Sequence, residues 1–305
     1  TPARVKTQII AEAWPCADAR HDDGPSQTAT DLDEGFLART TLALGLDVMR
    51  TIVSDQTIAV IGVGGLGSVI AENLIHMGFQ SVQLIDPDIV EITNLNRIVG
   101  ASRSDALESC LKVEVVKAHL LKINPTASVE AYPVGIEDPS VLPVLMRSDW
   151  IVVATDSHFS RFLAQKIALQ LAVPLISAGV NITVEQDQIV DWSGEVIVAR
   201  SGDRLCLNCL GRINPTLVAA YEHRADTIGA KLVDKGYVTG HEVKEPAVKT
   251  LNSIIGAMTV DLLINQFTLR QAPLPIWVYE SNRQFSIYPD QFALGADEDP
   301  CYFCG

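Results

Sequence analysis

From residue 57 to residue 178, short apolar runs alternate with longer segments in which apolar residues recur every three or four positions. The short runs predict five strands, at residues 57–62, 81–86, 128–132, 150–154 and 174–178. The longer segments predict helices at residues 33–53, 66–77, 105–123 and 157–171. Strands that alternate with helices imply βαβ units, so we expect an α/β fold with a Rossmann-like, doubly wound and mostly parallel sheet.

The pattern changes after residue 180. Residues 182–199 have period-two character and predict antiparallel strands that extend the sheet, and residues 276–279 and 284–288 predict a final hairpin. Residues 246–269 predict a long helix, opened by Glu245-Pro246, whose apolar residues could belong to the core or to a dimer interface.

Two segments have little apolar periodicity. Residues 1–34, rich in Asp, Gly, Ser and Thr from residue 17, predict a flexible N-terminal segment, and residues 35–305 then form a single domain. Residues 212–245 are polar and charged and predict a flexible crossing loop within that domain.

Composition excludes several classes of function. The chain has 305 residues, of which 48% are hydrophobic, enough to bury a large core. No apolar run reaches the roughly 18 residues that a membrane span needs, and the first residues lack the layout of a signal peptide, so a cytoplasmic protein is expected. A net charge of −14 argues against a nucleic-acid partner, because binding to phosphate backbones needs a basic surface.

A glycine-rich turn follows the first predicted strand. Gly62, Gly64 and Gly67 fit the dinucleotide fingerprint, in which glycines let the backbone approach a phosphate at a helix N-terminus. Asp86 ends the next strand, where a carboxylate can accept hydrogen bonds from ribose hydroxyls. This pattern alone also suits a nicotinamide-dependent enzyme, or a tight turn without a ligand.

The residues after Asp86 narrow the choice. The series Asp86-Pro87-Asp88 is followed by Asn94-Leu95-Asn96-Arg97, and a nucleoside triphosphate requires such cationic and amide donors, whereas a nicotinamide site does not. In this series the chain resembles the ThiF/MoeB and ubiquitin-activating adenylyltransferase family over roughly residues 35–305. One departure is Ile98, where the family commonly has glutamine.

The resemblance implies a role for each matching position. Gly62, Gly64, Gly65 and Gly67 would line the nucleotide, Asp86 and Asp88 would lie at its ribose side, and Asp156 would bind magnesium or lie near the attacking carboxylate. The residues expected to contact the phosphates are Asn94, Asn96, Arg97, Lys112 and, often from a partner subunit in this family, Arg39. Arg97, Lys112, Asp156 and Arg39 are the catalytic candidates.

Each of these residues also has a plainer interpretation. Arg97 and Lys112 could be surface charges, Asn94 could cap the following turn, and Asp156 could be the N-cap of the helix that follows. The joint spacing of these residues, rather than any one of them, favours a nucleotide site.

Four of the six cysteines form two Cys-x-x-Cys pairs, which are Cys206 with Cys209 and Cys301 with Cys304. Together they can supply the four thiolates of a tetrahedral structural zinc site, which would clamp residues 295–305 to the rest of the domain. Two local redox pairs, or reduced thiols, are the alternatives.

Outside these pairs the sequence has only Cys16, in the N-terminal segment, and Cys110, expected near a helix start. Ubiquitin-activating enzymes form a thioester on a cysteine in or near the crossing loop, and residues 210–300 contain none. We therefore expect the reaction to stop at an acyl adenylate, as in adenylating enzymes of sulfur-carrier and peptide-antibiotic pathways.

The resemblance implies ATP-dependent adenylation of the C-terminal carboxylate of a ubiquitin-like or sulfur-carrier protein or peptide, with Mg²⁺ and Zn²⁺ bound, by a homodimer. The alternatives are a nicotinamide-dependent oxidoreductase and an inactive subunit of a heterodimeric activating enzyme. The crossing loop could bind the substrate's tail or could be a solvated loop; its candidate residues are Tyr221, His223, Arg224, Lys231, Lys235 and His241.

Overall fold

The structure is a computed structural model, and it describes residues 35–203, 205–222, 246–282 and 284–290, together with residues 301, 303 and 304. The N-terminal segment of residues 1–34 and most of the expected crossing loop lie outside the described residues.

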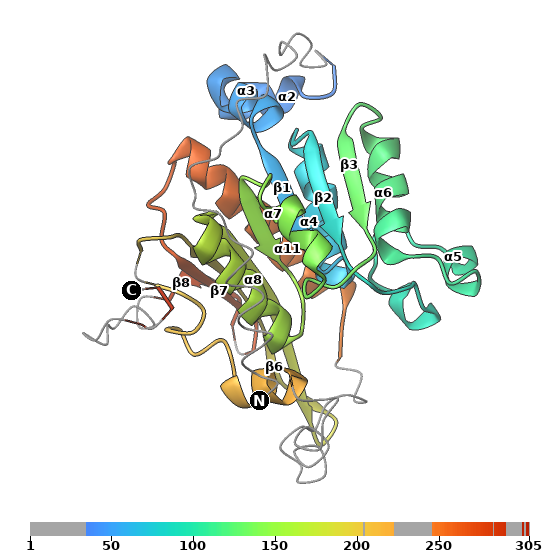
Figure 1. The fold of residues 1–305 in the computed structure, drawn as a ribbon, viewed down its shortest axis with the longest axis vertical. Coiled ribbons are helices and arrows are strands. Elements are labelled where there is room, and N and C mark those ends of the chain that lie inside the picture. The colour runs from blue at the N-terminus through green and yellow to red at the C-terminus, as the bar shows by residue number, and fades with distance from the viewer. Residues whose placement is uncertain are drawn as a thin grey trace. The chain divides into compact units, whose positions relative to one another are not determined.

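An eight-stranded sheet forms the centre of the domain, in the order β3-β2-β1-β4-β5-β6-β7-β8 (Figure 1). The pairs from β3 to β5 are parallel and the pairs from β5 to β8 are antiparallel, as the sequence predicted. The strands are β1 (Thr57–Ile61), β2 (Ser81–Ile85), β3 (Ser128–Tyr132), β4 (Trp150–Val153), β5 (Leu175–Glu185), β6 (Gln188–Ala199), β7 (Ile276–Glu280) and β8 (Ser286–Pro289).

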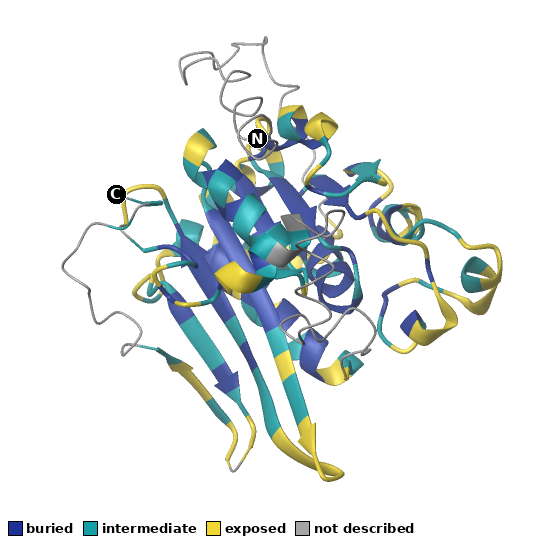
Figure 2. Ribbon diagram, turned by 60° about the horizontal axis from the view of Figure 1, so that its bottom comes forward, coloured by how far each residue is buried: buried dark blue, intermediate teal, exposed yellow. Residues whose placement is uncertain are grey.

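Helices cover both faces of this sheet. Those with residues in one core are α3 (Leu46–Ser54), α4 (Gly65–His76), α6 (Lys112–Ile123) and α11 (Lys249–Thr268), while α7 (Leu142–Leu145), α8 (His158–Leu171) and α9 (Pro215–Glu222) contribute to a second core. Strand β1 contributes to both cores, because successive side chains of a strand point to opposite faces of the sheet. Ile58 and Val60 face the first core, and Ala59 and Ile61 face the second. Buried strands therefore occupy the middle of the domain, and the far end of the β5–β6 hairpin is exposed (Figure 2).

The helix expected at residues 33–53 is two helices, α2 (Ala38–Leu44) and α3. Gly45 separates them with φ 87° and ψ 154°, a conformation that is essentially restricted to glycine. The apolar spacing predicted a continuous helix because that spacing contains no information about the backbone conformation at Gly45.

The helix expected at residues 105–123 is also divided. Helix α5 (Arg103–Leu107) is stabilised by a capping box between Ser102 and Asp105, and α6 begins only at Lys112. Between them, Ser109 has a left-handed φ of 54° and Leu111 forms a β-bridge with Ile89. Cys110 therefore lies just before the start of α6, in the connection that brings Lys112 toward β2.

The fifth strand is longer than expected, because β5 continues through residues 182–185 and pairs with β6 along almost its whole length. The connecting Gln186 and Asp187 have φ angles of 50° and 62°, typical of the tight turns that join antiparallel strands.

Part of the expected crossing loop is helical. The Asn214 carboxamide accepts hydrogen bonds from the backbone amides of Thr216 and Leu217, which caps α9 at residue 215. The long helix α11 starts three residues later than expected and packs between α4 and strands β5 and β6, so most of its apolar side chains belong to the core. None of the described helices is both long and apolar enough to cross a bilayer.

Candidate functional site

The glycine turn connects β1 to α4, and three of its glycines are required by backbone conformation or close contacts. Gly62 has φ 86°, and a Cβ on Gly67 would lie 1.8 Å from the Gly62 carbonyl oxygen. A Cβ on Gly65 would lie 2.5 Å from Asn252 Nδ2 and 2.8 Å from Arg97 Cδ. The first turn of α4 therefore packs directly on the end of β1, between α11 and the segment that contains Arg97.

Gly64 is different, because a Cβ placed on it would have no atom within 4 Å. It is the N-cap of α4, and no side chain caps that helix N-terminus. The backbone amides at a helix start attract anions, so the open space beside Gly64 is where the turn can accept a phosphate.

Asp86 joins this turn to the end of β2. Its carboxylate accepts hydrogen bonds from the backbone amides of Val63, at 2.7 Å, and Asp88, at 2.9 Å. The residue is 6% exposed. Burial raises the pKa of Asp86, and the nearby Lys112 and the two backbone amides act in the opposite direction.

Asp88 in turn positions Lys112. The Lys112 ammonium lies 2.7 Å from an Asp88 carboxylate oxygen, and the Lys112 backbone amide donates to the Asp88 carbonyl. The Lys112 side chain is 13% exposed and the Asp88 side chain 63% exposed. The structure thus brings Lys112 to the same edge of the sheet as Asp86.

Arg97 lies on the other side of the turn, where its aliphatic carbons pack over Gly65. One guanidinium nitrogen donates to the Thr93 carbonyl and to Asn96 Oδ1. Asn94 is buried, and its side-chain oxygen accepts from the Glu91 backbone amide, which completes the capping box of the turn Ile92–Asn94 that it ends rather than capping the turn that follows. Whether Asn94 also contacts a phosphate stays a prediction.

The segment that carries Arg97 is fixed to three helices. Ser68 Oγ of α4 accepts from the Val99 amide, and His119 of α6 packs against Gly100. The ammonium of Lys249, at the start of α11, donates to the Arg97 carbonyl. Burial lowers the pKa of Lys249, and the negative charge of Glu72 opposes this effect.

Asp156 follows β4 and is exposed at the same carboxyl edge. The N-cap of α8 is Ser157, whose hydroxyl accepts from the Ser160 amide, so the interpretation of Asp156 as the N-cap is wrong. Arg161 of α8 donates from Nε to the Thr155 carbonyl, and its guanidinium lies over Gly179 of β5.

Arg39 does not join these residues within one chain. It is exposed on α2, and the neighbouring Leu37 packs against Gly78, beyond the C-terminal end of α4. Phe36 also contacts His76 at that end, with ring centroids 6.3 Å apart. Arg39 is thus associated with the opposite end of α4 from the glycine turn.

The two Cys-x-x-Cys pairs meet as predicted. All four sulfur atoms lie within 4.8 Å of one another, with separations of 3.6 Å for Cys206–Cys209, 3.9 Å for Cys206–Cys301 and 3.6 Å for Cys209–Cys304. Zinc–sulfur bonds of about 2.3 Å in a tetrahedron would place the sulfurs about 3.8 Å apart. The four thiols therefore fit a zinc ion that has no open coordination position.

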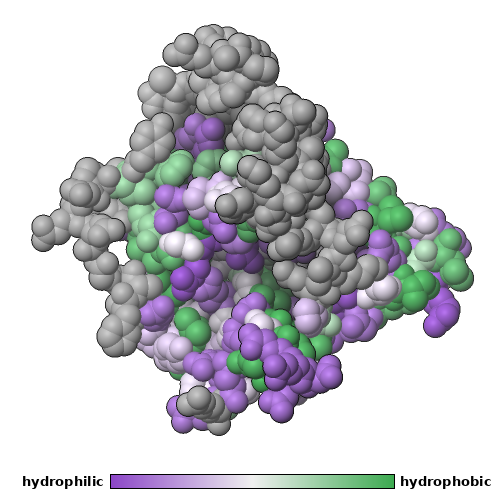
Figure 3. Space-filling model, turned by 90° about the horizontal axis from the view of Figure 1, so that it is seen from below, coloured by the Kyte–Doolittle hydropathy of each residue, from purple (hydrophilic) through white to green (hydrophobic). Residues whose placement is uncertain are grey.

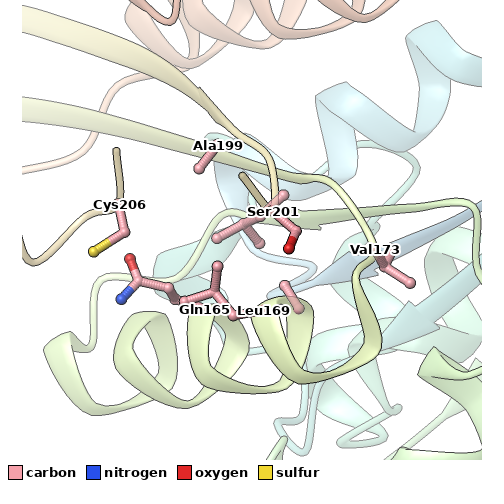
Figure 4. A pocket seen from close by; sticks show the side chains of 8 residues that line it. Gln165, Leu169, Val173, Ala199, Ser201 and Cys206 are labelled. Atoms are coloured by element: carbon pink, nitrogen blue, oxygen red, sulfur yellow. The ribbon is translucent and has the colours of Figure 1, made fainter. Parts of the chain in front are cut away.

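Contacts around the cysteines tie both pairs to α8. Phe303 packs edge-on against Phe162, and the Gln165 side-chain oxygen accepts from the Leu207 amide at 2.5 Å. Figure 4 shows Gln165 beside Cys206 at a cavity of about 10 Å³. That volume has room for about one water molecule, so this cavity is not a nucleotide site.

Figure 3 views the molecule from below, the side toward which the parallel strands of Figure 1 end. Hydrophilic and hydrophobic residues are intermingled over the part of this face that is drawn in colour. Sequence reasoning missed Ser68, Lys249, Arg161 and Asn252 at this edge. The one signal for Asn252 was a polar residue at a buried position of an apolar helix.

The chain belongs to the ThiF family, whose model matches residues 37–285. It is 34% identical over 120 residues to the sulfur carrier protein adenylyltransferase of Thermus thermophilus, covering 39% of this chain and 44% of the relative. It is 24% identical over 253 residues to the adenylyltransferase and sulfurtransferase UBA4 of Saccharomyces cerevisiae, covering 83% of this chain and 51% of the relative. The chain thus spans about half the length of the curated relatives it matches.

Solved structures share the fold. MccB of E. coli, crystallised with ATP, has a TM-score of 0.67 and 22% identity, over 89% of this chain and 74% of that one. PaaA has a TM-score of 0.61 and 17% identity, over 94% and 90% of the two chains.

Gly64 and Gly67 lie in different surroundings, so alanine at the two positions should have different effects on stability and on ATP binding. Gly64→Ala should change the free energy of unfolding by about 1 kcal/mol or less, as expected at an N-cap, but should weaken ATP binding on the order of tenfold because the methyl group occupies the open space. Gly67→Ala should cost about 3 kcal/mol or more in stability, because its Cβ cannot fit. Urea unfolding and calorimetric titration measure both, and equal stability losses in the two variants would contradict this geometry.

The cysteine cluster predicts about one zinc ion per chain, measured by elemental analysis after purification without added metal. Cys301→Ser should remove most of the zinc and lower the thermal midpoint by roughly 5 °C or more. Cys110→Ser is the matched control and should retain the zinc. A folded, zinc-free protein with disulfides inside each pair would support the redox alternative instead.

Proposed function

We propose that this protein uses ATP to adenylate the C-terminal carboxylate of a ubiquitin-like or sulfur-carrier protein, or of a peptide, with release of pyrophosphate. The relatives named adenylyltransferases and the fold shared with MccB, which has been crystallised with ATP and with MccA, support the class of reaction.

The observation that carries the proposal is the placement of two cations around one glycine turn. Lys112 is connected to the turn through Asp88 and Asp86, and Arg97 packs directly over Gly65. Positive charge on two sides of a helix N-terminus suits a nucleoside triphosphate better than a nicotinamide dinucleotide. Hydride transfer from a nicotinamide develops no additional charge on the phosphates of that cofactor. The arrangement therefore favours adenylation over the oxidoreductase alternative.

The reaction is an attack of a carboxylate oxygen on the α-phosphorus, in which the bond to the pyrophosphate oxygen breaks. No protein nucleophile is required, so the residues act by orienting the triphosphate and by stabilising the charge that develops on it. Lys112 and Arg97 supply that stabilisation, and the Asp86 carboxylate accepts hydrogen bonds from the ribose.

A magnesium ion, if bound, would offset the negative charge of the phosphates. Magnesium sites use one or two carboxylates together with substrate phosphates, and the exposed carboxylate of Asp156 at the carboxyl edge fits such a site. The cysteines would bind zinc, which supplies stability rather than chemistry because its four ligands leave no position for a substrate.

Arg39 enters this scheme only from a second copy of the chain, because it is associated with the far end of its own α4. We therefore propose a homodimer in which each Arg39 reaches the triphosphate bound by the other subunit. The buried side chains of α11 belong to the core and leave the dimer interface to other surfaces.

The adenylate would leave the enzyme without a covalent thioester. Cys110, the free cysteine nearest the site in sequence, has its backbone amide bonded to the Asp105 carbonyl and its carbonyl bonded to the Val90 amide. Cys16 lies outside the described residues. A reductant-sensitive adduct with the substrate, stable to denaturation, would contradict this part of the proposal.

The substrate is proposed as a protein or peptide tail rather than a nucleic acid. The chain is also 33% identical over 142 residues to a tRNA threonylcarbamoyladenosine dehydratase of Bacillus subtilis, covering 46% of this chain. The net charge of −14 disfavours tRNA as a substrate.

The expected crossing loop contains Tyr221, whose ring stacks on Phe159 with the ring centroids 4.2 Å apart. The other candidate residues of this loop, from 223 to 241, lie outside the described residues. A cytoplasmic location is part of the same proposal.

Replacing Lys112 tests the site directly. Lys112→Ala should slow adenylation by about a hundredfold or more, since one charge-stabilising donor is worth about 2.7–4 kcal/mol in comparable sites. The fold should persist because Asp88, which loses its partner, is largely exposed and stays hydrated. Lys122→Ala, at an exposed position of the same helix, is the control and should change the rate less than about twofold.

The function itself is tested by exchange of labelled pyrophosphate into ATP in the presence of small proteins ending in Gly-Gly, with and without those residues. Exchange that requires the intact tail would establish adenylation and its substrate class together. An enzyme that binds a nicotinamide cofactor and not ATP would refute the proposal.

A further inference from the structure

Helix α11 begins beside the start of α4, and one of its residues has an unusual position. Asn252 lies next to Gly65, and Gly256, one turn later on α11, faces Val69, one turn later on α4. The two helices thus run side by side from the same end, and both N-termini approach the carboxyl edge of the sheet.

Asn252 is 3% exposed, yet its carboxamide forms no hydrogen bond with any residue that the structure describes. Buried amides are normally hydrogen-bonded because desolvation without a partner is unfavourable. The fully enclosed side-chain atoms without partners belong, among the described residues, to Thr155, Gln165, Thr268 and Trp277. The Asn252 amide is not among them, so it is not fully enclosed and retains some solvent access.

Three features around this amide indicate the charge of its missing partner. Its Nδ2 lies 2.5 Å from the position of a Gly65 Cβ, at the first residue of α4, where a helix dipole favours anions. The Arg97 side chain packs on the same glycine. The start of α11 is fixed to that segment by two bonds, from Lys249 Nζ to the Arg97 carbonyl and from Asn96 Nδ2 to the Ala247 carbonyl.

We propose that Asn252 is a nucleotide-binding residue, and that its side-chain amide donates a hydrogen bond to a phosphate oxygen of the triphosphate beside Arg97. This assignment rests on the proposed ATP-dependent function. It also makes α11, the helix that follows the expected crossing loop, part of the phosphate site rather than only part of the core.

The test compares Asn252→Ala and Asn252→Asp with wild type in calorimetric titration of the full-length protein with Mg-ATP. Loss of one hydrogen bond to a charged group should weaken ATP binding on the order of tenfold to a hundredfold. The aspartate, nearly identical in shape, should weaken it further because its carboxylate repels the phosphates. Binding of adenosine, followed by NMR, should be the same in all three proteins.

Asn265→Ala is the matched control, because Asn265 is a buried amide on the same helix with partners of its own in Gln271. It should lower the thermal midpoint without changing the affinity for ATP. If one Asn252 variant fails to fold, the other carries the test. Wild-type affinity for ATP in a folded Asn252 variant would overturn the assignment while leaving the proposed function intact, whereas a wild-type protein that does not bind ATP would overturn both.

Discussion

The Asp86 carboxylate connects the two loops from which the candidate site is built. One oxygen accepts from Val63 in the glycine turn after β1, and the other accepts from Asp88 beyond the end of β2. Because Asp88 pairs with Lys112, this single buried carboxylate fixes the glycine turn, the end of β2 and Lys112 relative to one another. The same burial raises the pKa of Asp86, because the charged carboxylate loses contact with water.

The arrangement of the sheet explains why these groups meet at one edge. Parallel strands β1, β2 and β4 all end on the same side, so the glycine turn, Asp86 and Asp156 follow from connectivity. The antiparallel extension has a different role. It returns the chain to α11, whose start is bonded to the Arg97 segment, and it places Cys206 and Cys209 where the C-terminal pair can meet them.

The sequence predicted the order of the strands and of the longer helices, because strong apolar periodicity follows directly from two-sided burial of the sheet, but it did not predict α7 or α9. It was wrong where a single backbone conformation breaks a periodic segment, as at Gly45 and Ser109. The glycine turn, the acidic pair and the cysteine cluster were recognisable because their spacing is local or chemically distinctive. The surroundings of Gly65 were not, since Asn252 is nearly two hundred residues away in sequence and only packing brings it to the turn. The resemblance assigned Arg39 to the phosphates, often from a partner subunit, and the fold associates this residue with the end of α4 opposite the glycine turn.

In the proposed reaction, a substrate carboxylate attacks the α-phosphorus of ATP. The most direct measurement uses a substrate whose C-terminal carboxylate carries oxygen-18, followed by mass spectrometry of the AMP released when the adenylate is consumed. Transfer of one labelled oxygen into AMP is the predicted result, because the bond that forms joins that oxygen to phosphorus. Formation of unlabelled AMP, or of ADP in its place, would contradict the account.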